Sequence, residues 1–393
     1  MKSILKQILQ FWAVYYLILL GAVPYFFPAD SRLEIATKFN SLMIYSLLAL
    51  ALHVIVGYTG ILHLGIAGYF GIGAYMTGIL CTPIFPFEFC FLYLIVIAIV
   101  TAAIAAVVFT APMLRLRGDY LALVTLGFGQ IIIFVIQNME SITAGTQSLS
   151  PVDPALVPKW SYPLFKSLGF SETWLNYDWK IFPNFYLLTL LMLMLVYWLL
   201  HNLEQSALGR ALVALREDEL AASCMGLSPV KLKLIALALA GAISGLAGCL
   251  YVTSISSTAG PKDYGFNRSI LMLCCLILGG LGNRRGLLVG AFILVGYDTI
   301  LADILNTQIQ QTTWSTKVKN LLQPSNWKFA LFGGVLILIM RYRPEGLFPA
   351  QRKSRAVKTP LESASQSTVS PQGSVSIAPS NSPLDSNSAK QEN

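Results

Sequence analysis

The sequence is short of charge and of metal-binding or redox side chains. Only 12% of its 393 residues are Asp, Glu, Lys or Arg, whereas soluble globular domains average about 25%. It has three histidines and six cysteines, and no two cysteines have C-x-x-C spacing. The low charge excludes an ordinary soluble domain, and the cysteine spacing gives no disulfide framework and no zinc motif.

Motifs of catalysis and nucleotide binding are also missing. The chain has no G-x-x-x-x-G-K-[ST] phosphate loop, no H-E-x-x-H and no G-x-S-x-G. Its glycine-rich stretch 279–286 lacks the lysine and hydroxyl that would hold phosphates. We therefore expect no cofactor and no enzymatic activity in this chain. The net charge of +8 does not indicate nucleic acid, because the basic residues lie mainly between and after apolar runs.

What the sequence does contain is a series of apolar runs of the length that crosses a bilayer, about 20 residues. They lack the period-two alternation of a transmembrane β-barrel. The runs predict an all-α polytopic membrane protein with about ten transmembrane segments, at residues 8–27, 41–57, 61–80, 91–114, 120–138, 183–200, 233–254, 269–283, 286–305 and 327–341.

Glycines distinguish two kinds of segment. Residues 61–80 contain five glycines, which predicts a broken or re-entrant helix that protein or a water-filled cavity must surround. The pair Gly241 and Gly245, and the series Gly282, Gly286 and Gly290, have the four-residue spacing that lets membrane helices pack closely.

The basic residues predict the orientation. With the N-terminus in the cytoplasm, the short basic clusters all fall on the cytoplasmic side, as the positive-inside rule requires. An even number of spans then puts both termini in the cytoplasm. Residues 1–349 form the predicted transmembrane domain. Eleven of residues 351–393 are serine, and we expect 350–393 to be a disordered cytoplasmic tail.

The most charged stretch, residues 210–226, lies between apolar runs. We expect it to form one helix with Leu212, Leu215, Glu219 and Ala222 on a shared face, ended by Gly226. A charged cytoplasmic helix between spans can serve as a contact for a soluble partner. The candidate coupling residues are Arg216, Glu217, Asp218, Glu219, Ala222 and Gly226.

Ionisable groups within the apolar runs would indicate an ion-coupled secondary transporter. The candidates are His53, His63 and Asp298. Three isolated groups make a poor proton or sodium relay, so this reading is kept as an alternative.

Five motifs occur in order between residues 41 and 349: the glycine-rich 60–65 with 70–75, 117–129, the charged 208–226, the glycine-rich 279–286, and the arginine-rich 341–348. Together they resemble the branched-chain amino acid permease family, the membrane subunits of binding-protein-dependent ABC importers. The arginine-rich ending and the outer loop before residue 183 are typical of the larger of the family's two paired permeases.

The resemblance implies a set of partners in a bacterial inner membrane. These are cytoplasmic ABC ATPase subunits contacted through residues 202–232, a second homologous permease that forms a heterodimer with this chain, and an external substrate-binding protein. The implied cargo is a branched-chain or other neutral amino acid. His63 and Gln130 depart from the family pattern, so an importer of urea or short amides stays open. The candidate pathway residues are His63, Gly65, Tyr69, Tyr75, Thr125 and Gln130.

Overall fold

The computed structural model describes residues 29–82, 89–116, 119–152, 183–255, 257–258, 260–311, 324–343 and 346–348. The chain divides into two units, Met1–Ala350 and Gln351–Asn393, and the described residues all lie in the first. The predicted span 8–27, part of the 117–129 motif and the predicted tail lie outside the described residues.

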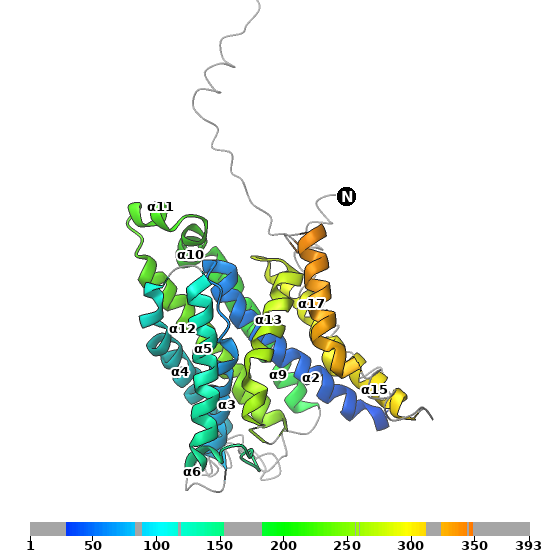
Figure 1. Ribbon diagram of the computed structural model, residues 1–393. Coiled ribbons are helices and arrows are strands. Elements are labelled where there is room, and N and C mark those ends of the chain that lie inside the picture. Colours follow the sequence, from blue (N-terminus) through cyan, green and yellow to red (C-terminus); the bar gives the residue numbers. More distant parts are fainter. Residues whose placement is uncertain are drawn as a thin grey trace, which may run out of the picture. The chain divides into compact units, whose positions relative to one another are not determined.

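Every element of the described residues is a helix (Figure 1). In chain order they are α2 (Ala29–Leu52), η2 (His53–Gly57), α3 (Ile66–Cys81), α4 (Phe91–Thr110), η3 (Pro112–Arg115), α5 (Asp119–Asn138), α6 (Glu140–Thr143), α9 (Asn184–Gln205), α10 (Ala207–Glu217), α11 (Glu219–Cys224), α12 (Pro229–Ile255), η5 (Pro261–Tyr264), α13 (Phe266–Gly279), α14 (Arg284–Gly296), η6 (Tyr297–Leu301), α15 (Ala302–Gln311) and α17 (Pro324–Tyr342).

The all-helical class is confirmed, and the number of spans is not. Six helical stretches of the described residues are long and apolar enough to cross a membrane: Leu33–Gly57, Phe91–Thr110, Tyr120–Asn138, Asn184–Gln205, Pro229–Ile255 and Arg284–Asn306. Helix α3 is apolar but has 16 residues, or about 24 Å at 1.5 Å per residue. The count of about ten spans and the position of the termini stay predictions.

Helix α12 packs against α2, α3 and α4. A Cβ atom on Gly241 would lie 2.7 Å from the carbonyl oxygen of Ala102, and one on Gly245 would overlap the carbonyl oxygen of Ala98. Small residues let the backbones of membrane helices touch. The predicted close contact at Gly241 and Gly245 is therefore confirmed.

Helices α13 and α14 form a second glycine contact. A Cβ atom on Gly286 would overlap the Gly279 carbonyl oxygen, and one on Gly290 would overlap that of Cys275. The prediction is confirmed for these two residues. It is wrong for Gly282, which lies in the turn between the helices with φ of +89°, a conformation that favours glycine.

Helix α4 has one apolar face that the rest of the unit leaves uncovered. An 18-residue stretch of this helix has a mean hydropathy of 2.9. Ala98, Ala102 and Ala106 are buried on the opposite face. The exposed apolar stripe runs the length of the helix, as is typical of a surface that faces lipid, and it consists of Leu92, Val96, Val100, Ile104 and Val108.

Candidate functional site

The chain leaves regular helical geometry between α2 and α3. The π-helix His53–Gly57 follows α2, and residues 60–65 are irregular until α3 begins. Gly60 has φ of +72°, and a Cβ on Gly65 would overlap the carbonyl oxygen of Thr125 in α5. The interruption predicted within 61–80 is therefore present at its start, where glycine lets the backbone approach α5.

A polar cluster forms around this irregular segment. The Thr125 hydroxyl accepts from the Leu64 amide at 3.1 Å. The Tyr69 hydroxyl lies 3.3 Å from His63 Nε2 and 2.5 Å from the Thr110 hydroxyl. These four polar side chains are at most 1% exposed. Four of the six predicted pathway residues, His63, Gly65, Tyr69 and Thr125, thus come together.

The hydrogen bonds assign the histidine tautomer. The Gly65 amide donates to His63 Nδ1 at 3.2 Å, so Nδ1 carries no proton. Nε2 then bears the hydrogen and donates to the Tyr69 hydroxyl, which donates to Thr110. The cluster is a chain of neutral donors and acceptors. It suits a polar uncharged group better than an ion.

The other two predicted pathway residues lie apart from this cluster. Gln130 is partly buried further along α5. Tyr75 packs edge-on against Tyr264, with ring centroids 5.7 Å apart. Tyr264 belongs to an aromatic cluster that joins α2, α3, η5 and α12 and that the sequence motifs did not indicate; its members are Tyr45, Phe70, Tyr75, Tyr251 and Tyr264.

The charged stretch forms two helices, so the prediction of one helix over 210–226 is wrong. Helix α10 ends at Glu217, and the Asp218 carboxylate caps α11 by accepting from the amides of Leu220 and Ala221 at 2.8 and 3.0 Å. Aspartate is among the best N-cap residues, and this cue was in the sequence. The predicted helix end at Gly226 is confirmed, since this residue has the left-handed φ of +83°.

The tip of this helix pair exposes apolar side chains. Leu220 is 74% and Met225 is 83% exposed, while the predicted coupling residue Ala222 is buried in the pair. Glu217 and Glu219 are exposed beside them, and Glu219 pairs with Lys233 of α12 at 2.8 Å. Exposed apolar residues beside charges are typical of a protein contact surface. The sequence analysis did not single out Leu220 or Met225, which lie on this exposed tip.

Arg216 connects α10 to the irregular segment. Its Nη1 donates to the Gly57 carbonyl oxygen at 2.7 Å. A Cβ atom added to Gly60 would lie only 3.0 Å from the Cγ of Arg216, so the side-chain stem packs against Gly60. Residues 159 positions apart are thereby joined. A displacement of α10 would act directly on the chain just before His63.

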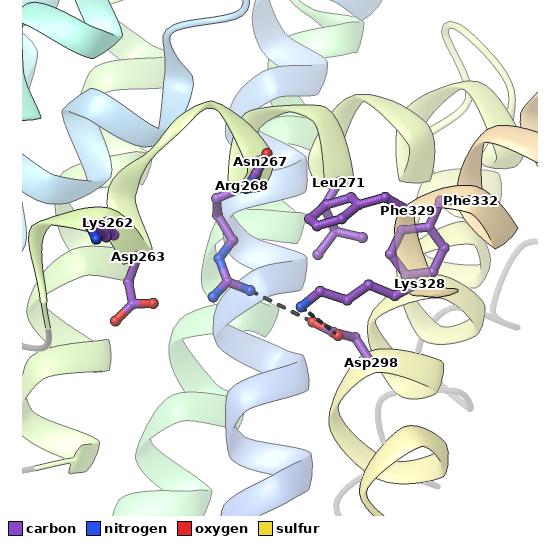
Figure 2. A pocket seen from close by; sticks show the side chains of 9 residues that line it. All are labelled: Lys262, Asp263, Asn267, Arg268, Leu271, Asp298, Lys328, Phe329 and Phe332. Carbon is purple, nitrogen blue, oxygen red and sulfur yellow. Dashed lines mark hydrogen bonds and ion pairs between the residues drawn. The ribbon is translucent and has the colours of Figure 1, made fainter. Parts of the chain in front are cut away.

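A small charged pocket lies between η5, α13, η6 and α17 (Figure 2). Asp298 faces two cations, Lys328 at 3.3 Å and Arg268 at 3.9 Å. The Arg268 guanidinium also stacks over the Tyr45 ring, 4.4 Å from its centroid. Asp298 is therefore part of a charged group of three, and the prediction from the sequence that it is an isolated group is wrong.

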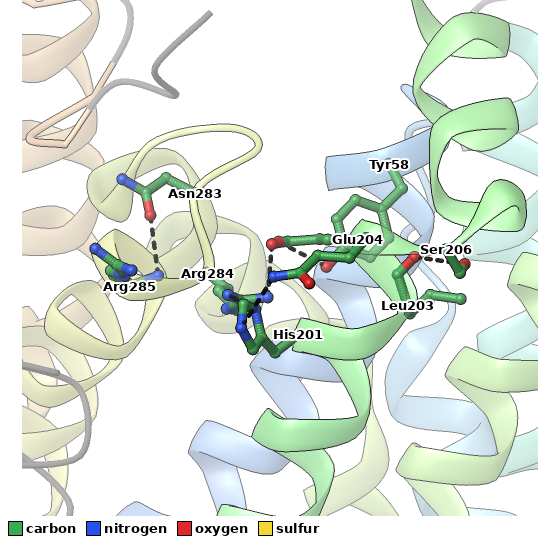
Figure 3. Close-up of polar contacts among 9 residues, drawn as sticks. Tyr58, His201, Leu203, Glu204, Ser206, Asn283, Arg284 and Arg285 are labelled. Carbon is green, nitrogen blue, oxygen red and sulfur yellow. Dashed lines mark hydrogen bonds and ion pairs between the residues drawn. The ribbon is translucent and has the colours of Figure 1, made fainter. Parts of the chain in front are cut away.

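A second charged network joins α9 to α14 (Figure 3). Arg284 donates to Glu204 at 2.6 Å and to His201 Nδ1 at 2.6 Å, and the Tyr58 hydroxyl donates to Glu204 at 3.0 Å. Burial raises the pKa of Tyr58, and the Glu204 carboxylate raises it further, so the hydroxyl stays protonated as a donor. Among the described residues, no three His, Cys, Asp or Glu side chains are placed to hold a metal ion.

Comparison with known proteins identifies the family. The profile of the family described as branched-chain amino acid transport system / permease component matches residues 35–340. The chain is 33% identical over 380 residues to the high-affinity branched-chain amino acid transport system permease protein LivM of Escherichia coli K12, covering 91% of this chain and 78% of that protein.

Two further relatives agree. LivM of Salmonella typhimurium LT2 is 32% identical over 358 residues, covering 85% of this chain and 74% of the relative. A probable LivM of Methanocaldococcus jannaschii is 27% identical over 318 residues, covering 76% and 84%. No solved structure matches the chain. Together with the apolar helices, these matches show that the chain is a multi-pass membrane permease that belongs to the family of branched-chain amino acid transport system permease components.

Proposed function

We propose that this chain is the larger of two paired permease subunits in a binding-protein-dependent importer of branched-chain or other neutral amino acids. ABC ATPases on the cytoplasmic side drive it, and an external binding protein delivers the substrate. The relatives named above are permeases of branched-chain amino acid transport systems, and this chain carries no phosphate loop of its own.

The distribution of basic residues supports a cytoplasmic position for the α10–α11 end. The Tyr58–Glu204–Arg284 network and the Arg216–Gly57 bond bring the ends of η2, α9, α10 and α14 together. The amide of Phe348 donates to Gly279, which brings the chain just after α17 to the same end. Basic residues gather there, as the positive-inside rule requires: Arg210, Arg216, Arg284, Arg285, Arg341 and Arg343.

The observation that carries the proposal is the connection from the exposed α11 tip to the His63 cluster. Leu220 and Met225 offer apolar contacts to an ATPase. Arg216 holds the adjoining α10 to Gly57, and residues 60–65 lead from there to the cluster. Closure of the ATPases on nucleotide binding would push α11, and the push would reach the irregular segment through one charge-assisted hydrogen bond.

The complex purified through a tag on this chain and reconstituted in vesicles tests the proposal. The vesicles hold ATP inside, where the ATPase subunits also face, and the binding protein is added outside. Leucine should then be transported into the vesicles, and excess valine should compete with it. Excess urea should not compete. Suppression by urea and not by valine would assign the chain to the amide branch, and transport without ATPase subunits would support an ion-coupled carrier.

We propose that the pathway passes the His63 cluster. Single cysteines at positions 61–75 should react with a water-soluble thiol reagent on one face, and the pattern should change with nucleotide. A cysteine at Val100, on the exposed apolar face of α4, is the matched control that lipid should protect in every state. Uniform protection of positions 61–75 with and without nucleotide would contradict the assignment.

A further inference from the structure

The Asp298 pocket has the composition of a site for a small molecule that carries both charges and an apolar side chain. Its volume is about 160 Å³, room for about five waters at roughly 30 Å³ each. Leu271 and Phe332 give it a buried apolar wall, at 4% and 2% exposed, and Phe329 covers the same side (Figure 2). Charged and apolar walls thus face one cavity.

The charges in the pocket do not cancel. Arg268 and Lys328 are two cations, and Asp298 is one carboxylate, so the three leave one positive charge. Their side chains are 18%, 31% and 15% exposed. Ionisable groups that are this little exposed inside a membrane protein are costly, and they mark substrate or ion pathways among other functional sites. On the rim, Lys262 and Asp263 add one charge of each sign, so the excess remains positive.

The Arg268 guanidinium is held in place without donating a hydrogen bond to Asp298. The two groups are 3.9 Å apart, which is an ion-pair distance and too long for a hydrogen bond. The Tyr45 ring fixes the guanidinium from behind. Its planar set of N–H donors matches a carboxylate, which it can bind through two parallel bonds.

The pocket lies far from the coupling end of the unit. Asp298 follows Arg284 by 14 positions along α14 and η6, or about 20 Å at 1.5 Å per residue. The hydrocarbon core is about 30 Å thick. With Arg284 at the cytoplasmic end, the pocket is in the outer half of the membrane.

We propose that Arg268 and Lys328 bind the carboxylate of an α-amino acid on its way in, with the apolar side chain against Leu271 and Phe332. The amino group faces the carboxylates of Asp298 and Asp263. This outward site receives the substrate before it reaches the His63 cluster. The inference deepens the proposed function and rests on it for the choice of an amino acid as ligand.

Protection of a cysteine on the rim tests the site directly. Asn267 lines the pocket and is exposed, so Asn267→Cys in the nucleotide-free complex gives a thiol that a cationic reagent can reach; labelling of the unsubstituted complex is subtracted. Leucine at about 10 mM, enough to fill a site of millimolar affinity, should slow labelling severalfold. The leucine analogue without an amino group, 4-methylpentanoate, should also protect, and 3-methylbutylamine, which lacks the carboxylate, should not.

Arg268→Gln in the same background should raise the leucine concentration for half-protection about tenfold or more, because a charged hydrogen bond is lost. Lys328→Gln should act in the same direction and leaves Arg268 in place if the first variant does not assemble. Lys231→Gln removes an equal charge from the exposed start of α12 and should change nothing.

The proposal is overturned if leucine leaves the labelling rate unchanged, if 3-methylbutylamine protects as well as 4-methylpentanoate, or if Arg268→Gln keeps full protection. Slower labelling in phosphatidylglycerol than in phosphatidylcholine nanodiscs, without an effect of leucine, would assign the pocket to lipid phosphate and overturn it too. Normal leucine transport alongside any of these results would refute the pocket alone, whereas a complex that transports no amino acid would refute the proposed function.

Discussion

Exchanging a single atom of the Glu204 side chain should cost the protein substantial stability. Arg284 is only 7% exposed in its side chain, its Nε has no hydrogen-bond partner, and Glu204 is the one carboxylate within ion-pair distance of it in the described residues. Glu204→Gln keeps the size of the side chain and removes the charge. It leaves a buried guanidinium uncompensated.

The size of the effect follows from the burial of the pair. Removing one partner of a buried ion pair costs about 3–5 kcal/mol. Glu204 is itself 30% exposed, so water reaches the site and lowers the cost. We therefore expect Glu204→Gln to lower the free energy of unfolding by about 2–4 kcal/mol.

A double-mutant cycle isolates the pair. Arg284→Met removes the cation and leaves Glu204 with the Tyr58 hydroxyl and water, so it should cost less than Glu204→Gln. The double variant should be more stable than the sum of the two predicts, by a coupling of about 2 kcal/mol. Unfolding of the purified chain in mixed micelles by titration with a denaturing detergent measures all four proteins.

The matched control is Glu217→Gln, which removes an exposed carboxylate from the same end of the unit and should stay within about 0.5 kcal/mol. The reasoning is refuted if Glu204→Gln also stays within that range, or if the two single changes simply add. Either result would mean that the Arg284 guanidinium finds other partners.

Three further outcomes are expected. Arg216→Ala should lower leucine transport about tenfold, because the bond to Gly57 is charge-assisted, and the ATPase should still co-purify; unchanged transport would contradict the mechanical link. Glu219→Lys should leave the protein in the membrane but reduce both transport and co-purification of the ATPase, and normal values of both would remove α11 from the contact. Gly245→Val should reduce the amount of folded protein in the membrane, because even a Cβ there overlaps the Ala98 backbone; Gly333→Val, where nothing lies within 4 Å, should not.

The sequence by itself determined the features that depend on composition and on near neighbours. A long uncharged run that lies in a membrane has to pair its own backbone polar groups, since they cannot stay unpaired in lipid, and a single run does so as a helix. Gly226 ends α11 because a left-handed backbone favours glycine, and Gly241 and Gly245 form a contact because their spacing puts both on one face. The break at Asp218 is also local, and the single helix was predicted because apolar periodicity was given more weight than an N-cap residue.

Only the tertiary structure decided which distant residues meet. His201 and Arg284 are 83 positions apart, and Arg216 and Gly57 are 159 apart. Asp298 looked isolated in the sequence, yet Arg268 of α13 and Lys328 of α17 face it. Tyr69, Thr125, Gln130 and Tyr75 were all predicted to line one pathway. Tyr69 and Thr125 do lie in one cluster, whereas Gln130 and Tyr75 lie elsewhere. Spacing along one helix fixes which face a side chain is on, but the partner on that face depends on how the helices pack. That packing is set by the sum of many weak contacts along their whole length, which no single motif records.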